Sequence, residues 1–183
     1  MRIIRGKFKT RKLGLPKGFP SRPTTDFAKE GLFNVLEHQL YLEDLNILDL
    51  CAGTGSITLE FLSREAGKVV AVDRNYNCVR HIVKMGKQYD CMDDLNVVKS
   101  DLLKYLRKTT DTFDLIIADP PYVYEHHAEI AAIVFERNLL KEDGILIIEH
   151  GKETKLESIT HFDILRTYGN VNFSFFKINE DAE

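Results

Sequence analysis

The residues best suited to chemistry lie in the stretch LIIADPPY at positions 115–122. Its apolar residues predict a strand that is buried on both faces, and the two prolines end that strand because they cannot donate to a ladder. The strand therefore delivers Asp119, Pro120, Pro121 and Tyr122 to the sheet edge as a rigid lip. The carboxylate and a proline carbonyl can accept both N–H bonds of the exocyclic amine of a planar base, and the tyrosine ring can stack on that base.

Such a lip would also help the amine to react. An aryl amine is a weak nucleophile because its lone pair is delocalised into the ring. Two acceptors placed out of the ring plane favour the pyramidal amine and stabilise the positive charge that develops as it attacks. The competing interpretation of the segment is a plain Pro-Pro turn after a strand.

A second candidate site is a glycine-rich turn. A short strand that begins at Asn46 runs into Gly53 and Gly55, and a helix is expected from about Ser56. Glycines at a strand-to-helix turn let a ligand approach the backbone closely. The next strand ends in Asp73, twenty residues beyond Gly53, where an acid can accept both hydrogen bonds of a ribose diol. A solvated acid at a strand end is the alternative, and the missing third glycine favours a ligand without a pyrophosphate.

Two more segments offer polar groups at element ends. Asp101 follows the strand expected at 95–99, either as the N-cap of a helix or as an acceptor for an adenine amine, and both roles are compatible. Thr25 or Asp26 can cap a helix that runs to about Leu40. The first turn of that helix also presents N–H groups and hydroxyls that suit a carboxylate.

The elements that must position these residues alternate between strands and helices. Gly169-Asn170 is a hairpin signal between the last two strands. The predicted strands cover residues 46–50, 68–72, 95–99, 113–118, 144–149, 162–168 and 171–178. This order predicts an α/β fold with a doubly wound, Rossmann-like sheet, whose ligands bind at the carboxyl ends of the strands. The residues expected to converge on that edge are Asp49, Gly53, Asp73, Asp101 and Asp119.

The start of the chain is strongly basic. Ile4, Gly6 and Phe8 alternate with cationic residues, which predicts a strand with one packed face and one cationic face; the cations are Arg5, Lys7, Lys9 and Arg11. Residues on one face repeat every ~6.6 Å, a spacing compatible with successive phosphates. We therefore expect residues 1–21 to form an arm that contacts nucleic acid, with a lysine-protected sheet edge as the alternative.

Composition agrees with a polyanionic partner. The 183 residues carry a formal net charge of −3, but residues 1–25 hold eight Lys/Arg and no Asp/Glu, and the rest hold 17 Lys/Arg against 28 Asp/Glu. A basic arm on an acidic body points to a polyanion held by the arm.

Other features argue against metal, disulfide and membrane chemistry. The three cysteines form no CxxC pair, which favours reduced thiols and no zinc site. His126 and His127 have no third ligand at a suitable spacing, so we expect rim residues there, and His150 is expected to be structural. Without an apolar run long enough to span a bilayer, or a signal peptide, we expect a cytoplasmic protein.

These residues resemble a known enzyme class. The segment DLCAGTG at 49–55, together with Asp73 and the lip at 119–122, is similar to the class I S-adenosylmethionine-dependent amino methyltransferases. The lip alone does not choose the base, because DNA adenine enzymes share it.

Longer segments narrow the resemblance to the RsmD family, whose members methylate the exocyclic N2 amine of one guanine in the 16S RNA of the small ribosomal subunit. Those segments are MRIIRGKFK at 1–9, RPTTDFAKEGLFN at 22–34 and YGNVNFSFF at 168–176, so that the likeness covers nearly the whole chain. Arg5 and Thr10 stand where small residues or glycine are usual in the family, and Cys51 stands where an aromatic residue is common.

The resemblance implies a seven-stranded methyltransferase sheet over residues 22–183, with an antiparallel last pair of strands, and a small basic N-terminal β-hairpin. It places Thr24 and Thr25 near the methionine end of the cofactor, Asp73 on its ribose and Asp101 on its adenine. The full expected cofactor set is Thr24, Thr25, Asp49, Gly53, Gly55, Asp73 and Asp101, the catalytic set is Asp119, Pro120, Pro121 and Tyr122, and the RNA-binding set is Arg5, Lys7, Lys9, Arg11 and Arg22.

The expected enzyme is thus an rRNA (guanine-N2-)-methyltransferase that acts as a monomer, without metal, on ribosomal RNA or an assembling small subunit. Two alternatives remain. A DNA adenine-N6 or other nucleobase amino methyltransferase would use the same lip, although 183 residues leave little room for a target-recognition insertion. A catalytically silent RNA-binding protein would need the basic arm but not the acids.

Overall fold

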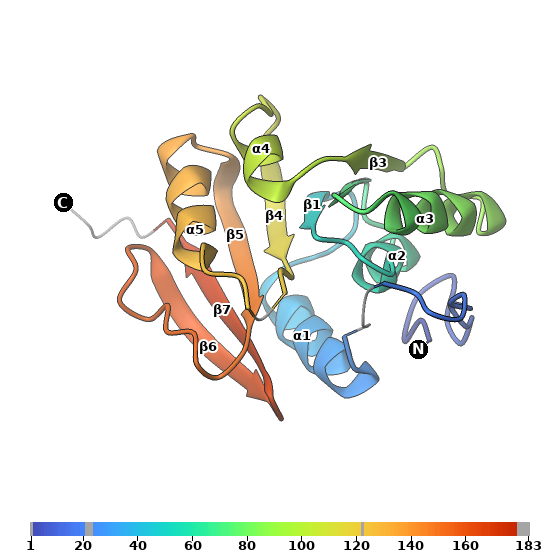
Figure 1. Cartoon of the computed structure of the whole chain (residues 1–183), viewed down its shortest axis with the longest axis horizontal. Helices are drawn as coiled ribbons and strands as arrows, with labels where there is room; N and C mark the ends of the chain where they lie inside the picture. The colour runs from blue at the N-terminus through green and yellow to red at the C-terminus, as the bar shows by residue number, and fades with distance from the viewer. Residues whose placement is uncertain (1, 21–23, 122, 179–183) are drawn as a thin grey trace.

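A computed structural model describes residues 2–20, 24–121 and 123–178. Within these ranges the chain has an α/β fold, in which helices flank one β-sheet (Figure 1). The strands are β1 Asn46–Leu50, β2 Lys68–Asp73, β3 Leu95–Lys99, β4 Phe113–Ala118, β5 Leu140–His150, β6 Phe162–Tyr168 and β7 Val171–Lys177. The helices are α1 Asp26–Gln39, α2 Ser56–Ser63, α3 Tyr76–Gln88, α4 Leu102–Leu106 and α5 His127–Glu136.

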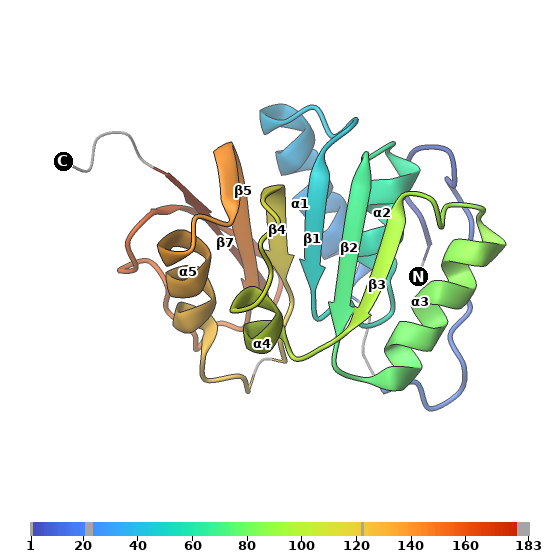
Figure 2. The ribbon, with the colours of Figure 1, turned by 90° about the horizontal axis from the view of Figure 1, so that it is seen from above.

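The seven strands lie in the order β3-β2-β1-β4-β5-β7-β6. Strands β1 to β5 pair in parallel, whereas β7 pairs antiparallel with both β5 and β6. The predicted doubly wound, Rossmann-like sheet with an antiparallel last pair is confirmed. Figure 2 shows the parallel strands ending at one edge of the sheet, where the loops to the next helices begin.

The two faces of the sheet carry separate apolar layers, because successive strand residues point to opposite faces. Helices α1, α2 and α3 cover one face, where Ile47, Leu115 and Ile117 are buried. Helices α4 and α5 cover the other face, over Leu48 and Ile116. Strand β4 is thus buried on both sides, as its run of apolar residues predicted.

Helix α1 buries a charged residue while leaving a large apolar one exposed. Phe27 is 68% exposed and packs edge-on with the Tyr168 ring. Lys29 is fully buried instead, because it finds a buried partner in Glu60 of α2 at 3.1 Å. A charged side chain hidden in this way needs such a partner, since an unpaired buried charge is costly.

The predicted N-terminal β-hairpin is not confirmed, and the strand expected from the alternation of residues 4–11 is wrong. Only one isolated antiparallel bridge forms, between Arg2 and Lys12. The chain between them turns, with left-handed φ values of 83° at Gly6 and 69° at Thr10. The buried side chains of this stretch are Ile3 and Phe8, which lie five positions apart in the sequence, whereas a strand would bury every second residue.

The N-terminal segment is held by hydrogen bonds to α2 instead of by a second strand. The backbone N–H groups of Ile4 and Arg5 donate to the Glu60 carboxylate at 2.9 and 3.0 Å. Lys7 N donates to the Ser63 carbonyl at 2.8 Å, and a Cβ on Gly6 would meet that same carbonyl at 1.8 Å. Glycine at position 6 is therefore required by close approach as well as by φ.

None of the helices in the described parts of the chain is both long and apolar enough to cross a membrane.

Candidate active site at the carboxyl edge of the sheet

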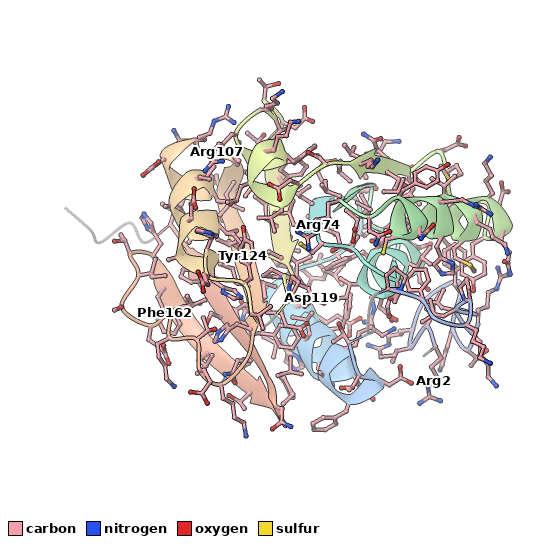
Figure 3. The ribbon with its side chains drawn as sticks, viewed as in Figure 1. Arg2, Arg74, Arg107, Asp119, Tyr124 and Phe162 are labelled. Atoms are coloured by element: carbon pink, nitrogen blue, oxygen red, sulfur yellow. The ribbon has the colours of Figure 1, made fainter. Side chains whose placement is uncertain are left out.

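A cavity lies at the carboxyl edge, between the ends of β1 and β4 and the start of α2. Four residues that the sequence nominated for cofactor or substrate line it together: Thr24, Asp49, Gly53 and Asp119. The rest of the lining is Cys51, Ala52, Thr54, Ser56 and Ile57. Figure 3 labels Asp119 at the end of β4 and Tyr124 toward α5.

The glycine-rich turn forms one wall through its backbone. Cys51, Gly53 and Gly55 all adopt left-handed φ values, of 61°, 52° and 72°. At Gly55, which caps α2, a Cβ would also come within 2.9 Å of the Ile82 side chain. Glycine at positions 53 and 55 thus permits backbone that other residues rarely adopt and leaves no Cβ there to hinder a ligand that approaches closely.

Asp73 organises this turn from the end of β2. One carboxylate oxygen accepts from Gly53 N at 2.8 Å, and the other accepts from Asn75 N at 2.7 Å. A carboxylate has about four lone-pair sites, so these two bonds leave capacity for further donors. Asp73 does not line the cavity, and its role toward a ribose stays a prediction.

Asp49 is a buried acid beside the cavity, only 1% exposed. Burial, with the negative charges of Asp119 and Asp73, raises its pKa to about 7. The Thr58 hydroxyl, which donates to Asp49 at 2.5 Å, limits this rise. The pKa of Asp49 therefore lies well above the ordinary value for an aspartate.

Asp119 meets a second acid that sequence reasoning missed. Its carboxyl is hydrogen-bonded to that of Glu149, a buried residue of β5, and the pKa of Asp119 is raised first by burial and then by the charge of Glu149. Thr24 Oγ1 lies 3.5 Å from Asp119 Oδ2 and 3.5 Å from Glu149 Oε2. In the sequence, Glu149 looks like a solvated acid at a strand end, and only the pairing of β4 with β5 brings it to Asp119.

Two nominated residues act as helix caps away from the cavity lining. Thr25 accepts from Ala28 N at 3.2 Å and caps α1. Asp101 accepts from Lys104 N at 3.1 Å and caps α4, with its side chain exposed. Both caps match the alternative role weighed from the sequence, and ligand contacts by either residue stay predictions.

The proline lip is only partly described. Pro120 is buried and Pro121 is exposed, whereas Tyr122 lies outside the described residues, as does Arg22. The Pro121 carbonyl accepts from Tyr124 N at 2.8 Å, so Pro120 is the better candidate for a carbonyl that faces an amine. Tyr124 follows the lip and packs edge-on against His127, and burial followed by the charge of Asp101 raises the pKa of its phenol to about 12.

The three histidines singled out in the sequence differ in burial. His127 is 3% exposed and packs edge-on against Tyr124, so its predicted rim position is wrong. His126 is exposed and lies 3.3 Å from Glu129. His150 is buried and bonded to the Ser174 hydroxyl at 2.8 Å, in keeping with a structural role. Within the described residues, no group of three or more His, Cys, Asp or Glu side chains is arranged to hold a metal ion.

The basic residues of the N-terminal segment are exposed, and some of them already have partners within the protein. Arg5 forms an ion pair with Glu37 at 2.6 Å, and the Arg11 guanidinium lies over the rings of Phe8 and Tyr89. Lys7 and Lys9 are exposed on the same segment. Contact of these residues with RNA stays a prediction, with Arg5 the weakest candidate because an acid already neutralises it.

Comparisons with known proteins agree with this architecture. YlbH of Bacillus subtilis is 31% identical over 97% of this chain and 98% of its own. The ribosomal RNA small subunit methyltransferase D of Haemophilus influenzae is 29% identical over 97% of this chain and 93% of its own. The structure of yhhF from Escherichia coli superposes with a TM-score of 0.84 at 23% identity and covers 96% of both chains, which speaks to the fold.

A family model also matches nearly the full length. The model described as conserved hypothetical protein 95 covers residues 1–177, including the N-terminal segment, the glycine-rich turn and the last pair of strands. The chain therefore belongs to the conserved hypothetical protein 95 family, which is the RsmD family that its sequence resembles.

Proposed function

We propose that this protein is a cytoplasmic S-adenosylmethionine-dependent methyltransferase that modifies the exocyclic N2 amine of a guanine in small-subunit ribosomal RNA. The observation that carries the proposal is the convergence of Asp119 and the glycine-rich turn on one cavity. The name ribosomal RNA small subunit methyltransferase D, borne by relatives from Haemophilus influenzae and Escherichia coli, supports the class of substrate.

The residues present fit the cofactor. The negative charges of Asp119 and Asp73 raise the pKa of Asp49, so the cavity favours a ligand that brings positive charge. S-adenosylmethionine carries a sulfonium and an ammonium group, and it supplies an electrophilic methyl group. Backbone at Gly53 would approach it closely, Asp73 would accept from its ribose, and Thr24 with Asp49 would face its amino-acid end.

The chain's own groups would act on the amine. Asp119 and the Pro120 carbonyl are the acceptors that hold it out of the base plane, and Tyr122 is proposed to stack on the base. Asp119 need not be a strong base, because the amine proton becomes acidic only after nitrogen has gained the methyl group. An unpaired or flipped guanine would be required, since the lip must reach the amine edge.

The experiment offers one acceptor at a time to the protein and labelled cofactor. Small-subunit particles, naked ribosomal RNA and duplex DNA are compared, and the labelled product is digested to nucleosides. We expect N2-methylguanosine from particles or RNA. Label in N6-methyladenine from DNA would favour the DNA-enzyme alternative, and no transfer with intact RNA binding would favour the silent RNA-binding alternative.

A further inference from the structure

Glu149 of β5 is a buried acid that touches the acid of the candidate lip. Its side chain is 3% exposed, and its carboxyl is hydrogen-bonded to the Asp119 carboxyl. The Thr24 hydroxyl lies 3.5 Å from each of the two acids. Polar groups from β4, β5 and the residues before α1 thus meet at one point beside the cavity.

This contact requires a proton. Ionised carboxylates only accept hydrogen bonds, so a bond between two carboxyls needs one of them protonated. Thr24 has a single O–H and cannot donate to both acids, and at 3.5 Å either bond would be long and weak. Two ionised carboxyls in contact away from bulk water would also repel strongly. The singly protonated pair is therefore the stable form of this contact.

The surroundings favour retention of that proton. On this side lie the titratable groups of Asp49, Cys51 and Asp73, with Arg74 near Cys51. The buried Lys29 ammonium bonds to Ser56 of the cavity lining at 3.0 Å, and its charge is paired with Glu60 at 3.1 Å. On the far side, β7 places Phe173 beside Glu149. Helix α5 brings His127 against His150, and burial lowers the pKa of both imidazoles, so both are neutral at neutral pH.

We propose that Glu149 is a positioning residue for methylation of the amine: it shares one proton with Asp119, so that the pair carries a single negative charge, and with the shared proton on Glu149 the Asp119 carboxylate accepts the amine N–H. This role rests on the proposed function. In the reaction the amine nitrogen bonds to the methyl carbon while the carbon–sulfur bond breaks with its electron pair on sulfur. The proton that nitrogen loses passes to Asp119, and one proton leaves the pair for solvent on product release.

The first test counts the proton without any substrate. Glutamate side-chain carboxyls are labelled with carbon-13 in the full-length protein, and Glu149 is assigned by its loss in Glu149→Gln. We expect the Glu149 signal of the wild type to complete its titration only above neutral pH, because the pair still shares one proton there, and to ionise at clearly lower pH in Asp119→Asn, where the amide donates to it. A wild-type Glu149 that is fully ionised at neutral pH would overturn the proposal.

The second test follows single-turnover methylation of RNA against pH. Glu149→Ala should slow transfer by about 10- to 100-fold with unchanged affinity for S-adenosylmethionine, and Glu149→Gln should recover most of that loss because its amide still donates to Asp119. The Gln variant should also lose the decline at alkaline pH that the wild type shows when the pair gives up its proton. Glu142→Gln, an exposed acid near the other end of β5, is the matched control and should behave as wild type.

Two results would overturn the role. One is a Gln variant that is as slow as the Ala variant at every pH, and the other is a Gln variant with an unaltered pH profile. Wild-type protein that methylates no nucleic acid would refute the proposed function and this role with it. A fully ionised Glu149 in an active enzyme would refute the role of Glu149 alone.

Discussion

At the scale of single residues, the site is marked by a buried acid, Asp49, that lies within electrostatic reach of Asp119 and Asp73. Burial and these neighbouring carboxylates raise its pKa to about 7. The motif predicted that this acid lies at the edge, but not that its pKa is raised. That property depends on the burial of β1 between β2 and β4, which a linear pattern does not display.

Asp49 should make the stability of the free protein depend on pH. Its folded-state pKa of about 7 lies above the ordinary value of 3.8, so between those values the folded state binds more protons and stability falls as pH rises. The free energy of unfolding of Asp49→Asn should therefore rise relative to that of the wild type, by a few kcal/mol at about pH 8, since one pKa unit is worth about 1.4 kcal/mol. Urea unfolding at several pH values across this range measures the difference in stability between the two proteins. A difference that does not grow with pH would contradict the raised pKa of Asp49.

Asp73 should couple cofactor binding to the turn it holds. Asp73→Ala removes the acceptor of Gly53 N and Asn75 N, so it should weaken binding of S-adenosylmethionine by about 2–4 kcal/mol and also loosen the turn. Calorimetry gives the affinity, and amide exchange at Gly53 reports the turn. Unchanged affinity in a variant with faster exchange would limit Asp73 to a structural role.

At the scale of elements, the strands and most helices followed from periodicity, and the failures have definite causes. The N-terminal alternation was a poor guide because Gly6 and Thr10 turn the chain and its N–H groups bond to Glu60 rather than to a strand. Lys29 looks like a solvated residue of α1 in the sequence, and only the packing of α1 against α2 shows why it is buried. Long-range partners of this kind leave no local signature.

The Lys29–Glu60 pair should fasten the N-terminal segment to both helices. Lys29 Nζ also donates to the Arg2 carbonyl at 2.7 Å and to Ser56 Oγ at 3.0 Å, and Glu60 accepts from two backbone N–H groups of the segment. Breaking a buried pair by removing one partner costs about 3–5 kcal/mol, so Lys29→Met should destabilise the fold on that scale in urea unfolding.

The control for the buried Lys29–Glu60 pair is the exposed ion pair that Arg5 of the N-terminal segment forms with Glu37. Arg5→Ala, which removes a partner of Glu37, should cost no more than about 1 kcal/mol, as for other surface ion pairs. Equal losses for the two variants would show that the buried pair has no special role in holding the segment.

At the scale of the whole molecule, charge is divided between a basic N-terminal segment and an acidic body. The exposed positions Lys7 and Lys9 are the best candidates for binding phosphate. Replacing both with Gln should reduce the slope of log affinity for RNA against log salt by about 0.7 to 0.9 for each phosphate that a lysine no longer neutralises. Cofactor affinity should not change, and Lys141→Gln, at the start of β5, serves as the control for net charge.

If the variant with Lys7 and Lys9 replaced is monodisperse and its RNA affinity depends on salt as in the wild type, the prediction that this segment binds RNA is wrong. Light scattering recorded beside the binding data separates that result from the sheet-edge alternative, which predicts aggregation without a change in slope.

The central claim is that a base amine reacts at Asp119, and the most direct measurement is single-turnover methyl transfer by Asp119→Ala together with its affinity for S-adenosylmethionine. Loss of one preorganised electrostatic partner predicts a rate about 100- to 1,000-fold below wild type with affinity within about twofold, because Asp119 is assigned to the amine and not to the cofactor. Near-normal transfer by Asp119→Ala would contradict the account.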